Sequence, residues 1–208
     1  MQLTITSNND VEKRHNISVS KDALDHAIRN IVSAYVSGAS TIILKGEGMY
    51  TVAEEARKVL SGVEITDETE SLIIMKIRTD FVDLQYDTIL RRIYNITRSM
   101  FSLTIKSFEG AEKHLEEINR KESEVDRLYL LALRQVSSSS SRPAQDEAVF
   151  KSIAAKAIEK ISDHIETIYT SGDRFMPNKE IARLLAKALD VYGAAYGFFA
   201  DGSPEISQ

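Results

Sequence analysis

Residues 89–103 read ILRRIYNITRSMFSL, and their apolar positions decide the architecture of the longer part of the chain. The apolar side chains that recur at alternating steps of four and three residues are Ile89, Ile93, Ile96, Met100 and Leu103. A helix turns by about 100° per residue, so this spacing places them on one face. The stretch therefore predicts a long amphipathic helix that ends at Gly110.

Three further helical patterns follow this one along the chain. The second continues to about Val136, and the third runs from about 145 to 170. Asn178 has the side chain of a helix N-cap, and an apolar periodic segment follows it. We therefore expect an antiparallel helical bundle over residues 80–200 and a tail at 201–208.

The first 79 residues alternate between strand and helix signals. The expected elements are a strand at 16–20, a helix at 20–37, a strand at 41–45, a helix from Thr51 to Gly62, and a hairpin of 63–67 with 72–78. The helix at Thr51 is expected from a capping-box pattern with Glu54. The fold class is therefore α+β, a small N-terminal α/β domain at 1–79 followed by the helical bundle.

Two of the expected helices each carry a pair of acids four residues apart, Glu122 with Asp126 and Glu159 with Asp163. A step of four keeps both carboxylates of a pair on one helix face, one turn apart. Two such helices packed together can present four acidic oxygen ligand groups to a hard or borderline cation. An isolated pair of this kind is more often a solvated face.

The phase of each helix sharpens these alternatives. Glu122 falls inside an apolar stripe, where an unpaired charge is costly, so it needs a metal or a partner such as Arg98. On the third helix, the isoleucines at 158, 161, 165 and 168 share one side, opposite Glu159, Asp163 and Glu166. This phase places any metal held by the third helix on the bundle surface.

Composition excludes several classes of function. The chain has 208 residues, a formal net charge of −5 and no cysteine, so disulfides, thiolate zinc sites and cysteine nucleophiles are excluded. The negative charge disfavours direct nucleic-acid binding by this chain. The sequence also lacks an apolar run long enough to span a bilayer and an N-terminal secretion signal. We expect a cytoplasmic protein without membrane insertion.

Two segments resemble the PhoU family of phosphate-uptake regulators. Residues 157–169, AIEKISDHIETIY, are similar to the signature helix of that family, and residues 122–128, ESEVDRL, are similar to its companion acidic motif. With VSGA at 36–39 and LSGVEI at 60–65, the chain most resembles archaeal proteins in which an AbrB-type DNA-binding domain precedes a PhoU module. Here the AbrB domain is missing, although residues 3–6 resemble its last strand.

The resemblance implies a non-enzymatic regulator of inorganic phosphate uptake that acts through a metal-dependent helical docking surface. The implied metal ligands are Glu122, Asp126, Glu159 and Asp163, and the ion is divalent or trivalent, with Mg, Mn, Fe or Zn as candidates. Its expected partners are the cytoplasmic subunit of a phosphate transporter or a sensor kinase. The alternative is a fragment of a transcriptional regulator whose AbrB domain lies outside this chain. Lys160, Thr167 and Thr170 depart from the signature.

The fourth helix leads to a prediction about assembly. It carries more apolar surface than one three-helix bundle is expected to cover, so we predict a homodimer or higher oligomer. The side chains expected in that interface are Leu184, Leu185, Leu189, Tyr192 and Phe199.

Overall fold

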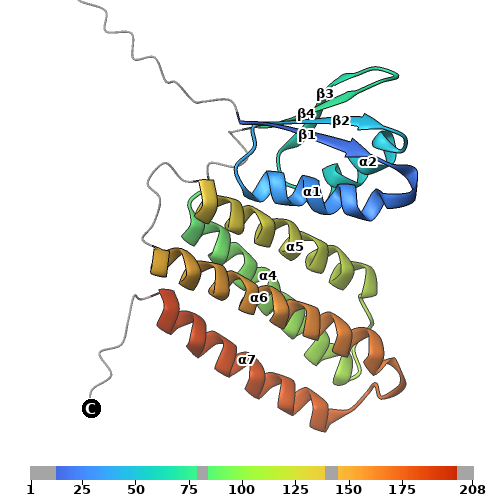
Figure 1. Ribbon diagram of the computed structural model, residues 1–208. Helices are drawn as coiled ribbons and strands as arrows, with labels where there is room; N and C mark the ends of the chain where they lie inside the picture. Colours follow the sequence, from blue (N-terminus) through green and yellow to red (C-terminus); the bar gives the residue numbers. More distant parts are fainter. Residues whose placement is uncertain (1–12, 79–83, 139–144, 201–208) are drawn as a thin grey trace, which may run out of the picture. The chain divides into compact units, whose positions relative to one another are not determined.

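The computed structural model describes residues 13–78, 84–138 and 145–200 (Figure 1). The chain divides into two compact units, residues 1–82 and residues 83–208. The expected boundary at 79, the tail at 201–208 and the strand at 3–6 lie outside the described residues. We call the two units the sheet unit and the helical unit.

The described part of the sheet unit, residues 13–78, holds four strands, two helices and one 3-10 turn. In chain order these are β1 (Arg14–Val19), η1 (Lys21–Ala23), α1 (Leu24–Val36), β2 (Thr41–Gly46), α2 (Met49–Val59), β3 (Val63–Glu68) and β4 (Ile73–Ile77). The strand order is β1-β2-β4-β3. β1 and β2 are parallel, as a β-α-β connection requires, and β3 pairs with β4 as the expected antiparallel hairpin.

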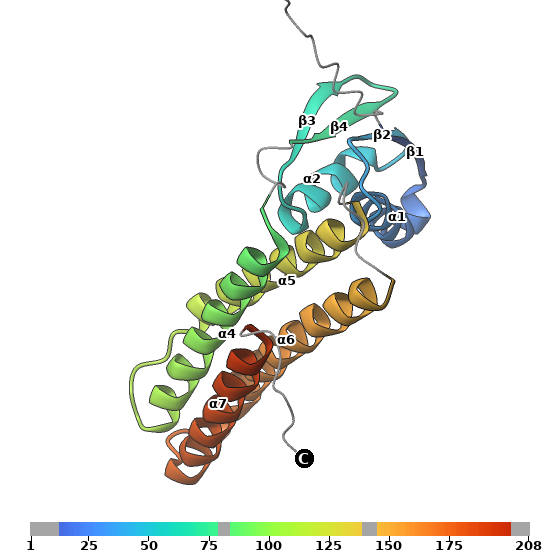
Figure 2. The same cartoon turned by 90° about the vertical axis from the view of Figure 1, so that its left-hand side faces the viewer.

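The core of the sheet unit lies between one face of this sheet and its two helices, which cover the same face (Figures 1 and 2). Strand side chains alternate between the two faces, so every second residue of β2 and β4 points toward the helices. Ile42 and Leu44 on β2 and Ile73 and Met75 on β4 have no solvent exposure. The burial of alternate side chains against the helices is therefore what fixes the register of these strands.

The start of α2 differs from the sequence prediction. The helix begins at Met49, and its N-cap is Gly48 with φ 90°, so the predicted capping box at Thr51 is wrong. The preceding Gly46 has φ 114°, and a Cβ there would lie 2.2 Å from the carbonyl oxygen of Val19. Because only glycine adopts this backbone easily, the turn geometry sets where the helix starts.

Within residues 84–138 and 145–200, the helical unit contains four long helices and one 3-10 turn. They are α4 (Tyr86–Phe108), α5 (Leu115–Ser138), α6 (Gln145–Ser171), η2 (Gly172–Arg174) and α7 (Lys179–Ala200). α4 packs against α5, α6 and α7, and α5 also packs against α6 (Figure 2). Three apolar residues of the stretch 89–103, Ile89, Ile93 and Met100, have no solvent exposure. The predicted helical bundle is confirmed, with α4 at its centre.

The beginning of α7 agrees with the sequence prediction. The Asn178 side-chain oxygen accepts hydrogen bonds from the backbone N–H groups of Glu180 (3.0 Å) and Ile181 (3.2 Å). These bonds satisfy two donors that a helix N-terminus leaves without intrahelical partners. Asn178 is therefore the N-cap of α7.

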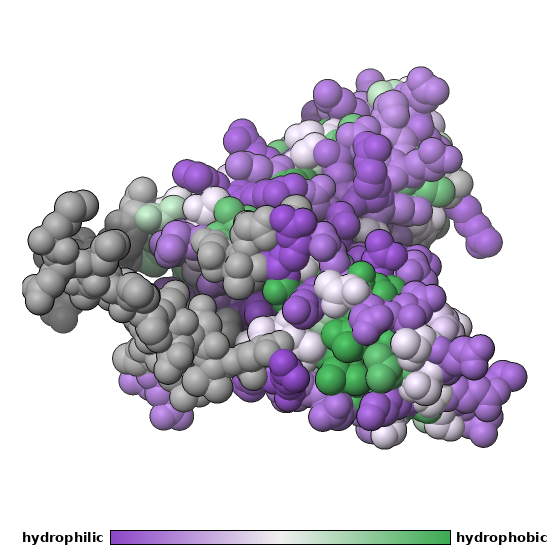
Figure 3. Space-filling view, turned by 90° about the horizontal axis from the view of Figure 1, so that it is seen from above, coloured by the Kyte–Doolittle hydropathy of each residue, from purple (hydrophilic) through white to green (hydrophobic). Residues whose placement is uncertain are grey.

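The apolar side of α7 is mostly covered by its own chain. Leu185 and Tyr192 are buried, Leu189 and Phe199 are partly buried, and only Leu184 of the five expected interface residues is largely exposed. The prediction that these five side chains form an uncovered apolar surface was therefore wrong, because α7 packs that side against α4. No described helix is long and apolar enough to cross a membrane. The face of the molecule in Figure 3 is mainly hydrophilic, with one compact apolar patch.

Candidate metal site

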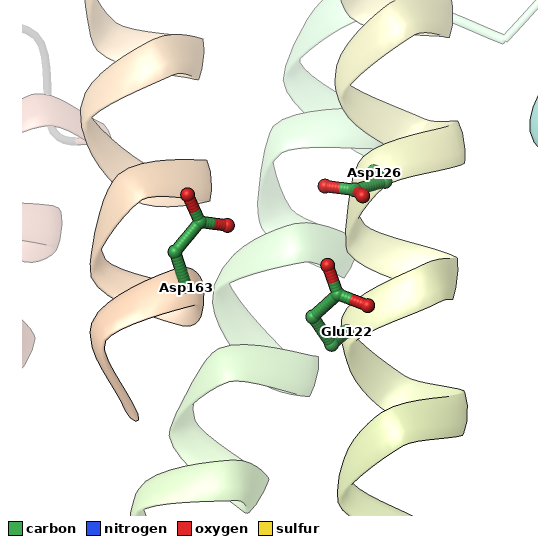
Figure 4. Close-up of side chains that lie close together, drawn as sticks. All are labelled: Glu122, Asp126 and Asp163. Carbon is green, nitrogen blue, oxygen red and sulfur yellow. The ribbon is translucent and has the colours of Figure 1, made fainter. Parts of the chain in front are cut away.

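Three carboxylates from two helices converge in the helical unit. Glu122 and Asp126 extend from successive turns of α5, and Asp163 faces them from α6 (Figure 4). One carboxylate oxygen from each residue lies within 4.8 Å of the other two. No other group of three or more acids or histidines in the described ranges is this close. We call these three residues the acid cluster.

The acid cluster is partly buried between α5 and α6. On α6 the buried side chains are Ala155, Ile158, Glu159, Ser162, Ile165 and Tyr169. Ile168, which was expected on the apolar side, is 38% exposed. The predicted phase of α6, with all four isoleucines on its buried side and Glu159 on the opposite side, was therefore wrong. The inward face of α6 is centred on Ser162, whose hydroxyl lies 3.2 Å from the sulfur of Met100 on α4.

Glu159 does not belong to the acid cluster, although the sequence placed it beside Asp163. It is only 7% exposed, and both of its carboxylate oxygens lie 2.6 Å from the Lys156 ammonium nitrogen. Oε1 accepts a hydrogen bond from that ammonium, whereas the buried Oε2 makes no hydrogen bond with any described residue. The Lys156 ammonium also lies 5.0 Å from the centre of the Tyr129 ring on α5. Lys156 is therefore held between its own helix and α5.

Asp163 has a lysine partner of its own. The Lys160 ammonium lies 3.0 Å from Asp163 Oδ2, and the Lys160 side chain is 56% exposed. An exposed pair three residues apart on a helix is a weak interaction, worth a few tenths of a kcal/mol. A cation that binds Asp163 can displace Lys160 at little cost.

The electrostatics of the acid cluster reflect crowded carboxylates. Burial, followed by the neighbouring Asp126 carboxylate, raises the pKa of Glu122 to about 7. Burial also raises the pKa of Asp126, while a hydrogen bond from Glu122 and the nearby Lys156 oppose that rise. The Glu122 carboxyl is therefore partly protonated at neutral pH and donates to Asp126. A bound cation would replace this proton, because carboxylate ligands bind metals in their ionised form.

The alternative partner expected for Glu122 is absent from this region. No ion pair joins Glu122 to Arg98 or to another residue that the structure describes. Besides its hydrogen bond with Asp126, Glu122 accepts a hydrogen bond from the Ser123 hydroxyl at 3.4 Å. The nearby Arg92 instead pairs with Glu124. Glu122 thus lacks the arginine that would explain a partly buried carboxylate, which leaves a proton or a metal as its counter-charge.

The donor set suits a hard or borderline cation. Carboxylate oxygens bind Ca²⁺ at about 2.3–2.6 Å and Mg²⁺ at about 2.0–2.1 Å. Two oxygens bound to one ion at these distances are at most about 4–5 Å apart, so three oxygens within 4.8 Å of one another are close enough to share an ion. Three protein ligands would leave further coordination positions for water or for another oxygen ligand. The geometry fits one ion, held by Glu122, Asp126 and Asp163.

Sequence reasoning overlooked Tyr129, Lys156 and Lys160. The two lysines each precede an α6 acid by three residues, a spacing that predicts ion pairs on a helix and was readable from the sequence. Tyr129 carries no comparable signal, because its role depends on how α5 and α6 pack. His164, which matches the family signature, is exposed rather than packed.

Comparisons with known proteins found one similarity, to a family domain, and it lies in the helical unit. No curated protein and no solved structure matches the chain. The family model described as the PhoU domain matches residues 90–171, a range that contains α5 and the whole acid cluster. The relationship to AbrB-containing proteins stays a prediction. The match shows that residues 90–171 of this chain are similar to the PhoU domain.

Proposed function

We propose that this chain is a non-enzymatic regulator of inorganic phosphate uptake whose helical unit binds a metal ion through Glu122, Asp126 and Asp163. The observation that carries this proposal is the convergence of three carboxylates, within 4.8 Å, inside the segment that the PhoU domain model matches. Glu159, the fourth ligand implied by the resemblance, is left out because Lys156 neutralises it.

The metal acts structurally in this proposal. A cation held by two acids of α5 and one of α6 bridges the two helices, and it replaces the repulsion among their carboxylates by attraction to one ion. The free energy of that binding adds to the stability of the helical unit. The surface formed by α5 and α6 is then fixed for a protein partner, either the cytoplasmic subunit of a phosphate transporter or a sensor kinase.

The proposal includes self-association through α7. Leu184, Val191 and Phe198 are 65%, 69% and 58% exposed, and they follow one another at seven-residue intervals. Ala188 and Ala195, also exposed, lie between them. Such a heptad stripe is the seam by which helices pair in coiled coils, so a second copy of α7 is the occupant we propose.

A binding experiment tests the docking function. The purified chain is passed over immobilised cytoplasmic subunit of the phosphate transporter encoded by the same genome, with Mn²⁺ and then with a chelator. We expect retention with metal, loss after chelation, and loss in the Asp126→Asn, Asp163→Asn double variant. Retention that ignores both changes would refute a metal-dependent surface, and no retention under any condition would refute the transporter as partner.

A further inference from the structure

Three charged residues that are not proposed metal ligands lie near the acid cluster: Glu159, Lys156 and Lys160. Glu159 is one helical turn from Asp163 on α6, and the ammonium groups of Lys156 and Lys160 lie 2.6 and 3.0 Å from these two acids. With every carboxylate ionised, four negative charges face two positive ones. Two net negative charges remain, which is the charge that one divalent cation neutralises.

We infer that Lys156 and Lys160 act as built-in counter-ions that limit the acid cluster to a single divalent cation. This inference rests on the proposed metal site and adds to it the class of ion and the two residues that select it. A second ion or a trivalent ion would leave the region with a net positive charge. Such an excess weakens binding, because the two half-exposed lysines repel the added positive charge even where water screens them.

Lys156 is the more firmly fixed of the two counter-ions. Its ammonium contacts both oxygens of Glu159 and the ring of Tyr129, and the hydrogen bond to Glu159 raises the pKa of Lys156, so it stays charged at neutral pH. Its charge acts on both Asp126 and Asp163. Lys156 therefore repels any cation at the acid cluster without leaving its place.

Lys160 has a different role, because it touches a proposed ligand directly. Its ammonium pairs with Asp163 Oδ2 and must release that oxygen when a metal takes it. The two lysine side chains are similarly exposed, 56% for Lys160 and 51% for Lys156, but Lys156 is also held by both oxygens of Glu159 and by the Tyr129 ring. Lys160 is thus a competitor for one ligand, whereas Lys156 contributes a standing positive charge.

The magnitude follows from Coulomb's law. A unit positive charge about 6 Å from a divalent ion in a largely aqueous medium weakens binding by roughly tenfold. The repulsion energy is proportional to the charge of the ion, so the same lysine lowers the affinity for a trivalent ion by roughly thirtyfold. Removing a lysine should therefore raise the affinity for both ions, and it should raise the affinity for the trivalent ion more.

The test measures Mn²⁺ by titration calorimetry and Tb³⁺ by its luminescence, at one pH, in the full chain. For Lys156→Gln we expect the affinity for Mn²⁺ to rise roughly tenfold and the affinity for Tb³⁺ to rise roughly thirtyfold. For Lys160→Gln we also expect both affinities to rise. The matched control is Lys151→Gln. Lys151 pairs with Glu147 at 2.7 Å on the same helix, about 18 Å along the axis from Asp163, so its removal should leave both affinities unchanged.

A second variant separates charge from folding. Lys156→Gln leaves the buried Glu159 without its partner, whereas the Lys156→Gln, Glu159→Gln double variant removes one charge of each sign. We expect the double variant to bind both ions as the unchanged chain does. Equal or weaker Mn²⁺ and Tb³⁺ binding in Lys156→Gln would overturn the inference while leaving the metal site intact.

The outcomes also separate this inference from the proposed function. If the unchanged chain binds no Mn²⁺ at millimolar concentration but Lys156→Gln does, the lysine blocks the site; the proposed function fails and the counter-ion role stands. If none of the variants binds either ion, both proposals are wrong.

Discussion

The sheet unit and the helical unit bury very different kinds of side chain. Among the described residues, the sheet unit buries one polar side chain, Thr41, beneath an otherwise apolar core. The helical unit buries two charged residues, Arg134 and Glu159, and four hydroxyl side chains, Thr97, Thr104, Ser107 and Ser162. Buried polar groups seldom add stability compared with apolar ones of similar size. The difference indicates that the core of the sheet unit is almost wholly apolar, whereas the helical unit also accommodates buried polar and charged side chains.

The largest effect should come from truncating the apolar core of the sheet unit. Ile42 has no solvent exposure. Replacing it with alanine removes buried apolar surface and leaves a cavity, so we expect Ile42→Ala to lower the free energy of unfolding by about 2–5 kcal/mol. Denaturant unfolding measures this loss, and the stabilisation by Mn²⁺ should be unchanged. A loss below about 1 kcal/mol would show that the sheet unit does not depend on this packing.

An intermediate effect is expected at the Lys156–Glu159 pair of the helical unit, and it should be asymmetric. Lys156→Ala leaves a carboxylate that is 9% exposed without its counter-charge, which should cost about 1–3 kcal/mol. Glu159→Gln removes the buried charge and should cost less. Thermal and denaturant unfolding in metal-free buffer compare the two variants. Equal losses, or a larger loss for Glu159→Gln, would contradict the view that a buried charge is being tolerated there.

A smaller effect concerns the dependence of stability on pH. The pKa of Glu122 rises from about 4.5 to about 7 on folding, so the folded chain binds more protons than the unfolded chain between these values. This carboxyl therefore favours folding below about pH 4.5, and its contribution is lost as the pH rises through 7. Melting curves in metal-free buffer at pH 5.5 and 7.5 should show a larger drop for the unchanged chain than for Glu122→Gln. Identical drops would mean that Glu122 titrates normally.

The smallest effect on stability should come from the exposed stripe of α7. Leu184→Glu changes a side chain that is 65% exposed, so the free energy of unfolding should change by no more than about 0.5 kcal/mol. Sedimentation at tens of micromolar should nevertheless show a shift from dimer toward monomer. Arg183→Glu, which changes a neighbouring exposed position outside the stripe, serves as the control. A monomer in the unchanged chain would refute the proposed self-association.

Much of the fold was predictable because it depends on local sequence. The β-branched run of β2, the four-and-three spacing of α4 and the Asn178 cap each act within a few residues of their own position. The start of α2 was missed because glycines with positive φ, rather than the capping pattern at Thr51, set the turn. Local signals thus gave the elements more reliably than their ends.

The candidate site was predictable only in part. The four-residue step correctly places Glu122 and Asp126 on one side of α5, because helix geometry alone decides that. Which α6 acid joins them depends on the rotation of α6 in the bundle. The four isoleucines all lie on one flank of Ser162, and they suggested a rotation that placed Glu159 on the outward side. Ser162, not an isoleucine, proved to be at the centre of the inward face. The selection of Asp163 over Glu159 could only come from the packed structure.

A metal titration of the melting temperature tests the central claim most directly, namely that Glu122, Asp126 and Asp163 hold a cation. The unchanged chain and the Asp126→Asn, Asp163→Asn variant are compared across Mn²⁺, Mg²⁺, Fe²⁺ and Zn²⁺. We predict that one of these ions stabilises the unchanged chain by about 2.7 kcal/mol at a hundredfold excess over its dissociation constant, and that the variant gains nothing. Melting curves of the unchanged chain that stay the same with all four ions would contradict the account.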